Sequence, residues 1–511
     1  MQAIHPFFLP VGNLVAKVGF ILKLSVLCKP QERADMKDNH YRQEKEEMNE
    51  LLRQYNNFKT GRKFKFIEEE SFQRLIEYFD ENDNLAAALE AANFAIEQFP
   101  YSSLFYVRKA DILIATQNYN EGLEFLSKAE VLDSNDINIY ILRTDAYLAL
   151  DFQEKAASIL EEAIVVFDGE DKIELLFELS DVYDDYEDFD KVFNCLRLIL
   201  EQDPSNEEAL YKICFWADYT GRNEESIQIH NQIIDEYPYS HLAWFNLGTA
   251  YQGLKLYEKA VDAYQYAIAI DEKFDYAYRN LGDAYLRIKK YREAIEALQK
   301  VLELSMPEEV IYEAIGYCYE KLKNTAQARF HYRKAVHLNS SESRLYYKIA
   351  CTYMQEGFWE SAVTNLESAM NINRNQPDYH FSIALCFIEL GRIKDAVIHF
   401  THFIKARPKN VKGWKELIRC LYEAEYYEEA LEQVYNAQKN TDNKPLFTYF
   451  KSAILFELGK SKEALLLLQM AMRQAPGMIR QFINLNPSLL QHPAVSDIIS
   501  NYKSSIKKKK K

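Results

Sequence analysis

The chain has 511 residues, of which 48% are hydrophobic and 27% charged, and its formal net charge is −16. A body with this charge repels phosphate backbones and anionic lipid surfaces, so generic binding of nucleic acid or membranes is disfavoured. The chain has only 15 glycines but 36 tyrosines and 30 phenylalanines, which favours packed helices and predicts few tight turns. No two of the 7 cysteines lie within three residues of each other, so buried, reduced thiols are expected rather than a zinc-ligand pair or a redox dithiol.

Residues 1–35 differ in composition from the rest of the chain. Their apolar stretch contains Lys17 and Lys23, and a lysine near the centre of a spanning helix costs about 2.5–3.5 kcal/mol. No basic start precedes the apolar stretch, as a signal peptide would require. We therefore interpret this segment as an unstructured or over-called leader with Met36 as the natural start, and expect no transmembrane segment and a cytoplasmic protein. The alternative is membrane association through residues 1–35.

Residues 36–67 are predicted to form a polar helix followed by a basic loop. The stretch MKDNHYRQEKEEMNELLRQYNNFK begins at Met36 and is dense in charged and amide side chains. It carries no export signal, which agrees with the cytoplasmic prediction.

From residue 69 to residue 476 the sequence repeats itself with a period of 34 residues. Within the segment WFNLGTAYQGLKLYEKAVDAYQYAIAID, residues 244–271, the opening aromatic and the small residues at Gly248 and Ala260 all return in one register. The opening large residue recurs at Phe72, Tyr106, Tyr140, Leu176, Leu210, Trp244, Tyr278, Tyr312, Tyr346, His380 and Trp414. A fixed period of this size indicates a solenoid of about twelve stacked units rather than separate globular domains.

Each unit is predicted to hold two helices of about 14 residues, such as 241–254 and 257–270, joined by a short turn. Small residues at Gly248 and Ala260 let the two backbones approach closely, while Tyr264 fills the space around them. One helix pair cannot bury both of its apolar faces alone, so neighbouring units supply the other wall.

The pattern resembles the tetratricopeptide repeat (TPR) family. The matching positions are Trp244, Leu247, Gly248, Tyr251, Ala260, Tyr264 and Ala267. The resemblance is strongest over residues 244–339. It implies an all-α fold, a right-handed α-solenoid of helix-turn-helix repeats whose first helices line a concave groove that holds a partner's peptide or surface.

Residues 477–503 are predicted to form short capping helices, since Pro487 and Pro493 suit the first turn of a helix and a solenoid needs a cap on its last repeat. The apolar residues expected to cover that repeat are Ile479, Phe482, Ile483, Leu489, Leu490, Ile498 and Ile499. Residues 504–511, SSIKKKKK, are interpreted as a solvated tail. The alternative is contact of Lys507–Lys511 with an acidic partner, RNA or anionic lipid.

No motif of catalytic chemistry stands out. The chain has no glycine-rich phosphate loop, no HExxH and no GxSxG. His399 and His402, three residues apart on a predicted second helix, are half of a possible metal site without an identifiable third ligand, so structural histidines are preferred. We predict no catalytic residues, no metal and no cofactor.

The groove is the remaining candidate site. In the TPR family, the residue after each opening aromatic and those four and seven positions further along tend to face the groove. Carried over by register, the resemblance implies as candidates Phe177, Tyr211, Phe215, Phe245, Arg279, Tyr347, Phe381, Lys415, Arg419 and Tyr449. Buried aromatics and arginines dominate interface energies, which favours a row of anchors for a peptide. The alternative is that these aromatics pack laterally on the first helix of the next unit.

The sequence therefore predicts a non-catalytic scaffold that binds a partner peptide or protein in the groove. An RNA- or membrane-associated adaptor acting through Lys507–Lys511 is the alternative, and self-association stays open.

Overall fold

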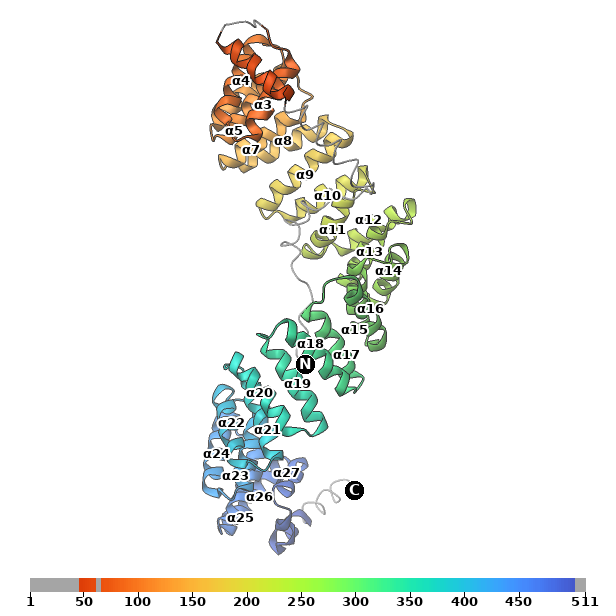
Figure 1. Cartoon of the computed structure of the whole chain (residues 1–511). Helices are drawn as coiled ribbons and strands as arrows, with labels where there is room; N and C mark the ends of the chain where they lie inside the picture. The colour runs from red at the N-terminus through yellow and green to blue at the C-terminus, as the bar shows by residue number, and fades with distance from the viewer. Residues whose placement is uncertain (1–45, 61–65, 501–511) are drawn as a thin grey trace. The chain divides into compact units, whose positions relative to one another are not determined.

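The computed structural model describes residues 46–60 and 66–500 of the chain (Figure 1). The predictions for the leader at residues 1–35 and for the tail at Lys507–Lys511 lie outside the described residues, as do residues 36–45 and 61–65 of the N-terminal segment. The described residues form helices joined by short turns, and no strand occurs among them. No helix within 46–60 or 66–500 combines the length and the apolar character needed to cross a bilayer.

The chain divides into two compact units, residues 1–284 and residues 285–511. In the first unit, residues 46–59 are helical and precede six pairs of helices. These are α3 (Glu69–Glu81), α4 (Leu85–Gln98), α5 (Ser103–Ala115), α6 (Tyr119–Leu132), α7 (Ile137–Ala149), α8 (Gln153–Val166), α9 (Gly169–Asp185), α10 (Phe189–Gln202), α11 (Glu207–Tyr219), α12 (Asn223–Glu236), α13 (His241–Gly253) and α14 (Tyr257–Ile270). Helix α15 (Asp275–Arg287) contains the boundary between the units.

The second unit continues the alternation and ends in short helices. Its elements are α16 (Tyr291–Leu304), α17 (Glu309–Lys321), α18 (Thr325–Leu338), α19 (Ser343–Glu356), α20 (Trp359–Ile372), α21 (Pro377–Glu389), α22 (Ile393–Ala406), α23 (Val411–Glu423), α24 (Tyr427–Asn440), α25 (Pro445–Glu457), α26 (Ser461–Gln474), η2 (Pro476–Met478), α27 (Ile479–Leu485) and η3 (Pro487–Gln491). Helices α3 to α26 make twelve hairpins in the predicted register, which confirms the prediction of an all-α solenoid of about twelve repeats.

The small residue of each second helix explains how a hairpin closes. The residues equivalent to Ala260, from Ala88 to Ala464, are buried in all twelve hairpins. On the facing helix, a Cβ added at Gly248 would lie 2.6 Å from the ring of Tyr264, and one at Gly316 would lie 2.6 Å from Tyr332. Each ring therefore packs directly on the backbone of the first helix.

The turn inside each hairpin corrects one prediction. The low glycine count predicted few tight turns, yet all twelve hairpins turn at a residue with positive φ. Four of these residues are Gly221, Gly357, Gly391 and Gly459. The other eight are Asp83, Gln117, Asp151, Glu187, Lys255, Lys289, Lys323 and Glu425, with φ between 54° and 64°. A side chain in this region costs about 1–2 kcal/mol, so helix packing, and not glycine, imposes the turn.

A buried histidine occupies a packing position of the second helix in one hairpin. His230 is fully buried at the position that Tyr264 holds in the next repeat. The amide of Asn246 donates to His230 Nε2 at 3.2 Å, and His230 Nδ1 lies 2.7 Å from the carbonyl oxygen of Ser226. Burial lowers the pKa of His230 to about 4, so the imidazole is neutral and donates its Nδ1 proton to Ser226.

The residues after α26 pack on the last hairpin. Phe482, Leu489 and Val495 form one buried cluster with Tyr449 of α25 and Leu468 of α26. At the other end of the chain, the ring of Tyr55 from the helical residues 46–59 packs among aromatic rings of α3 and α4. The apolar faces of the first and last hairpins are thereby covered by the chain itself.

Candidate functional site

The first helix of each hairpin presents one row of four positions spaced i, i+3, i+4 and i+7, which share a helix face. We call these four positions the stripe of that helix. On α11 the stripe consists of Glu208, Tyr211, Lys212 and Phe215. All ten groove residues predicted from the sequence occupy stripe positions.

In the first unit, the stripes of α9 and α11 border a hollow of about 450 Å³. Its lining residues are Glu170, Ile173, Glu174, Phe177, Glu178, Asp181, Asp203, Asn206, Glu208 and Lys212. Lys212 is the single cation among them. Its ammonium lies 2.9 Å from Glu208 and 5.0 Å from the centre of the Phe177 ring, a pairing that combines an ion pair with a cation–π contact. The α9/α11 hollow thus presents one aromatic face surrounded by carboxylates.

Carboxylates continue along the neighbouring stripes. Asp111, Asp145 and Asp181 hold the same stripe position on α5, α7 and α9. Loss of water at the helix surface, followed by the charge of Asp111, raises the pKa of Asp145. Loss of water, then the charges of Asp145 and Asp181, likewise raises the pKa of Glu178. These groups, which we call the acidic row (Asp111, Asp145, Glu178 and Asp181), repel one another across adjacent repeats.

Tyr211 is the most open of the predicted aromatics. Its side chain is 51% exposed. Burial of part of the ring and the charge of Glu207 raise the pKa of its phenol, and Tyr276 of α15 adds to the shift because it lies close by. Tyr276, itself 45% exposed, was not among the predicted residues, although it occupies the first stripe position of α15.

The other candidates of the first unit are half-buried. The Phe245 ring packs 5.0 Å from that of Phe274, and Phe215 lies 4.8 Å from the Trp216 ring. Arg279 on α15 is engaged in interactions with its surroundings.

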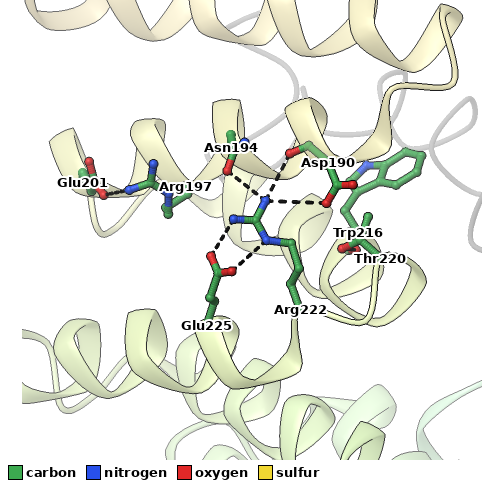
Figure 2. A network of polar contacts seen from close by, with 8 residues as sticks. All are labelled: Asp190, Asn194, Arg197, Glu201, Trp216, Thr220, Arg222 and Glu225. Carbon is green, nitrogen blue, oxygen red and sulfur yellow. Dashed lines mark hydrogen bonds and ion pairs between the residues drawn. The ribbon is translucent and has the colours of Figure 1, made fainter.

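Behind the stripe of α11, an arginine joins two second helices. Figure 2 shows the guanidinium of Arg222, which donates to Asn194 Oδ1 at 2.8 Å and to the Asp190 carbonyl oxygen at 3.2 Å, and also to Glu225 of α12 at 2.6 Å. The Phe193 ring lies 4.3 Å from the guanidinium carbon. Because the donors and the charge of Arg222 are used to join α10 to α12, this network supports the stripe and is not a site itself.

In the second unit the stripes carry cations beside aromatic rings. The Tyr347 ring lies 5.3 Å from that of Tyr379 on the next first helix, which is the lateral packing that the sequence left as an alternative. Phe381 packs 4.9 Å from Phe403. On α23, Lys415 and Arg419 lie 3.9 Å and 3.3 Å from the carboxylate of Glu416.

The structure corrects the prediction for Tyr449. Its ring is fully buried and packs 6.4 Å from Phe482, while its hydroxyl donates to the carbonyl oxygen of Ala475 at 3.1 Å. The C-terminal helices therefore cover the stripe of α25, and Tyr449 offers no surface to a partner.

The remaining candidate clusters show no arrangement for chemistry. His380 and His399 lie 3.1 Å apart through their Nδ1 atoms, and the ring of His402 stacks on His380. In the described ranges 46–60 and 66–500, no three His, Cys, Asp or Glu side chains are grouped so as to hold a metal ion. Burial raises the pKa of Cys195 and Cys386 to about 12, which makes these thiols poor nucleophiles.

Comparison with known proteins gives a family and a set of similar structures. Two family models of the tetratricopeptide repeat match residues 239–306 and residues 276–343. No curated protein matches the chain. YrrB, a TPR protein with an unusual peptide-binding site, is 18% identical with a TM-score of 0.33, over 36% of this chain and 95% of its own. MamA is 22% identical with a TM-score of 0.32, over 34% of this chain and 94% of its own. The Cut9-Hcn1 hetero-tetramer of APC/C is 11% identical with a TM-score of 0.32, over 76% of this chain and 97% of its own.

The family models match the part of the chain in which the repeat pattern is most regular. The same register of small and large positions continues through the other hairpins from α3 to α26. Residues 239–343 therefore match the tetratricopeptide repeat family, and the hairpins on either side repeat their register.

Proposed function

We propose that this protein is a non-catalytic interaction scaffold that binds a peptide or a protein surface along the stripes of its first helices. The observation that carries the proposal is Tyr211, half-exposed beside the α9/α11 hollow, in which Phe177 offers a second ring. A large aromatic side chain that keeps half of its surface in water forgoes the stabilisation of burial. A partner that covers both rings recovers it.

Charge supports the same surface. The acidic row and the hollow hold carboxylates whose pKa is raised by lost water and by one another. A basic or amide-rich partner segment would relieve this repulsion on binding. Aromatic anchors surrounded by polar groups are the usual composition of energetically important interface residues.

The test of this proposal is a double variant, Phe177→Ala with Tyr211→Ala. Proteins captured from the native cell by wild type and variant are compared by quantitative mass spectrometry, and the protein that the variant loses is purified for a direct binding measurement. We expect its affinity to fall at least about tenfold, the effect of losing one strong anchor.

A matched control is available in the same unit. Tyr101 and Tyr239 are 86% and 84% exposed in loops between repeats, so Tyr101→Ala with Tyr239→Ala removes as much exposed aromatic surface away from the stripes. Capture should be unchanged. If the stripe variant also captures every partner as wild type does while circular dichroism shows it folded, binding along the stripes is wrong.

A second candidate function rests on the sequence of the tail. Lys507–Lys511 place five positive charges next to one another, which suits RNA or an anionic membrane. Deletion of these five residues is expected to abolish any salt-sensitive binding to RNA or to vesicles containing phosphatidylserine. Unchanged binding after the deletion would remove this candidate.

A further inference from the structure

On one first helix of the second unit, the stripe holds more cations than acids. On α23, Lys412, Lys415 and Arg419 share the stripe with a single acid, Glu416. Arg419 lies 3.3 Å from Glu416 and 3.2 Å from Glu423, whereas Lys415 reaches Glu416 only at 3.9 Å. Lys412 makes no ion pair with any described residue and lies 4.9 Å over the Phe381 ring of α21.

On another first helix of the second unit, the stripe cations are paired with an acid of the same unit. On α19, Arg344 and Lys348 both reach the carboxylate of Glu313, at 2.8 Å and 2.5 Å. Glu313 is only 3% exposed, so it is a buried acid held by two cations and its oxygens are used. Positive charge left for a partner therefore concentrates on α23.

Glu416 does not offset these cations at the surface. It is only 8% exposed, and its carboxylate is held by Arg419 at 3.3 Å. A partner therefore meets Lys412 and Lys415 beside the apolar side chains of Phe381 and Leu385. Apolar surface suits a polypeptide, and the formal charge of −16 on the chain repels a phosphate backbone, which argues against a nucleic acid on this stripe.

The adjacent stripe shows that this face accommodates polypeptide. On α25, Tyr449 and Ala453 are covered by Phe482 and Leu489 from the chain's own C-terminal helices. The same segment reaches the C-terminal end of α23, where Asn486 donates to the hydroxyl of Tyr422 at 2.8 Å. Towards the start of α23, Lys412 is exposed and Lys415 half-buried, and Phe381 and Leu385 of α21 are half-buried.

We propose that Phe381 and Leu385 of α21, with Lys412 and Lys415 of α23, bind an extended acidic segment of a partner protein. Lys412 and Lys415 pair with its carboxylates, and Phe381 and Leu385 contact an apolar side chain. The segment is recognised by its side chains and needs no free C-terminus. The inference rests on the proposed function, since it names a partner chemistry for one of the stripes.

The test uses the full chain and a fluorescein-labelled, C-terminally amidated peptide of about twelve residues in which Asp and Glu alternate with Leu. Fluorescence anisotropy at low salt is expected to show binding that weakens as salt is added. The double variant Lys412→Glu with Lys415→Glu is expected to bind at least about tenfold more weakly, because reversed charges now face the peptide. A Lys–Leu peptide of the same length and a poly(U) RNA serve as competing probes.

The control is Lys405→Glu with Lys409→Glu, which makes the same charge change on exposed residues at the end of α22 and in the loop that follows. It should bind the acidic peptide as wild type does. Equal weakening in both double variants, or displacement of the acidic peptide by poly(U), would overturn the inference.

Failure of this inference can be told apart from failure of the proposed function. If the acidic peptide does not bind, while Phe177→Ala with Tyr211→Ala still loses a captured protein, only the chemistry assigned to α23 is wrong. If the acidic peptide binds and the reversal of Lys412 and Lys415 weakens it, the inference stands for this stripe whatever the first unit binds.

Discussion

Helices α9 and α23 hold equivalent places in their repeats, yet their stripes differ in charge. The four positions read Glu174, Phe177, Glu178 and Asp181 on α9, and Lys412, Lys415, Glu416 and Arg419 on α23. Behind the stripes the packing positions of the second helix are buried in both hairpins, with Val192 and Leu196 on α10 and Ala430 and Val434 on α24. Buried packing positions are thus kept in both hairpins, whereas the charge of the stripe positions differs.

The interiors of the two units differ at one position, where His230 stands in the first unit and Tyr332 and Phe400 stand in the second. Burial lowers the folded-state pKa of His230 to about 4, against about 6.5 in the unfolded chain. Between these values the unfolded state binds more protons, so stability is complete above pH 6.5 and is lost as the pH falls toward 4. The loss reaches about 3 kcal/mol at pH 4, at about 1.4 kcal/mol per pH unit.

The measurement is urea unfolding between pH 7 and pH 4, followed by the fluorescence of Trp216 and Trp244 in a chain with Trp359 and Trp414 replaced by Phe. His230→Phe should remove this part of the pH dependence in the first unit. If wild type and variant lose stability equally between pH 6.5 and pH 4, the buried neutral imidazole is not its cause.

Each unit contains a glycine of a first helix that packs against a tyrosine ring of the second helix. Gly248→Val and Gly316→Val each place a side chain against a tyrosine ring that would lie 2.6 Å from the new Cβ atom. We expect each change to cost about 2 kcal/mol, the usual cost of overpacking. The cost is read from the urea midpoint of each variant.

The matched control for these two variants is Gly477→Ala, since nothing lies within 4 Å of a Cβ there and an open site changes stability by less than about 0.5 kcal/mol. A large loss of stability in one unit with none in the other would show that the hairpins close differently. The packing of the two units would then not be alike.

The fold was predictable because its signal is local and repeated. The packing positions recur in a register of 34 residues, and pairs such as Gly248 with Tyr264 and Gly316 with Tyr332 encode both helices of a hairpin and the contact between them. The turns were not predictable in the same way, because Glu187 and Lys255 adopt positive φ with no glycine to signal it. Tertiary packing holds these residues in a conformation that their own preferences oppose.

The candidate surface was only partly predictable. Register alone places a residue on the stripe, so Phe177 and Tyr211 could be found from the sequence. Whether a stripe is open depends on distant segments, and the sequence did not show that residues after α26 fold back over Tyr449. Tyr276 was missed because the carried-over positions begin one helical turn later than its place on α15.

The two units also differ in the residues at their turns. In the first unit five of the six turn residues with positive φ carry side chains, against three of six in the second. Lys255→Gly should therefore stabilise the first unit, and Gly391→Ala should destabilise the second, each by up to about 1 kcal/mol. Hydrogen exchange resolved by mass spectrometry over α13–α14 and α21–α22 measures each change locally.

A Gly→Ala change inside a helix would report helix propensity, whereas the two turn variants report backbone strain. Lys255→Gly and Gly391→Ala should therefore change stability in opposite directions. If Lys255→Gly destabilises the first unit, the Lys255 side chain contributes more through its contacts than its φ of 62° costs, and strain at the turns does not distinguish the two units.

The smallest expected effect tests the acidic row directly. Loss of water and the charge of Asp111 raise the folded-state pKa of Asp145, so its ionised form is disfavoured in the folded chain. The stability that Asp145 contributes is complete below its unfolded-state pKa of about 3.9 and is lost as the pH rises through the higher folded-state value. Asp145→Asn should therefore stabilise the first unit at pH 7 by a few tenths of a kcal/mol, a small figure because the side chain is exposed and screened.

This gain should disappear at pH 3 and shrink in high salt, and Glu258→Gln, a change on exposed α14 away from the acidic row, should show neither dependence. If Asp145→Asn destabilises the chain at pH 7, the carboxylate has a favourable partner, and the row is not a source of repulsion. The acidic stripes would then lack the unrelieved charge that separates them from α23, and a basic partner would gain nothing by covering them.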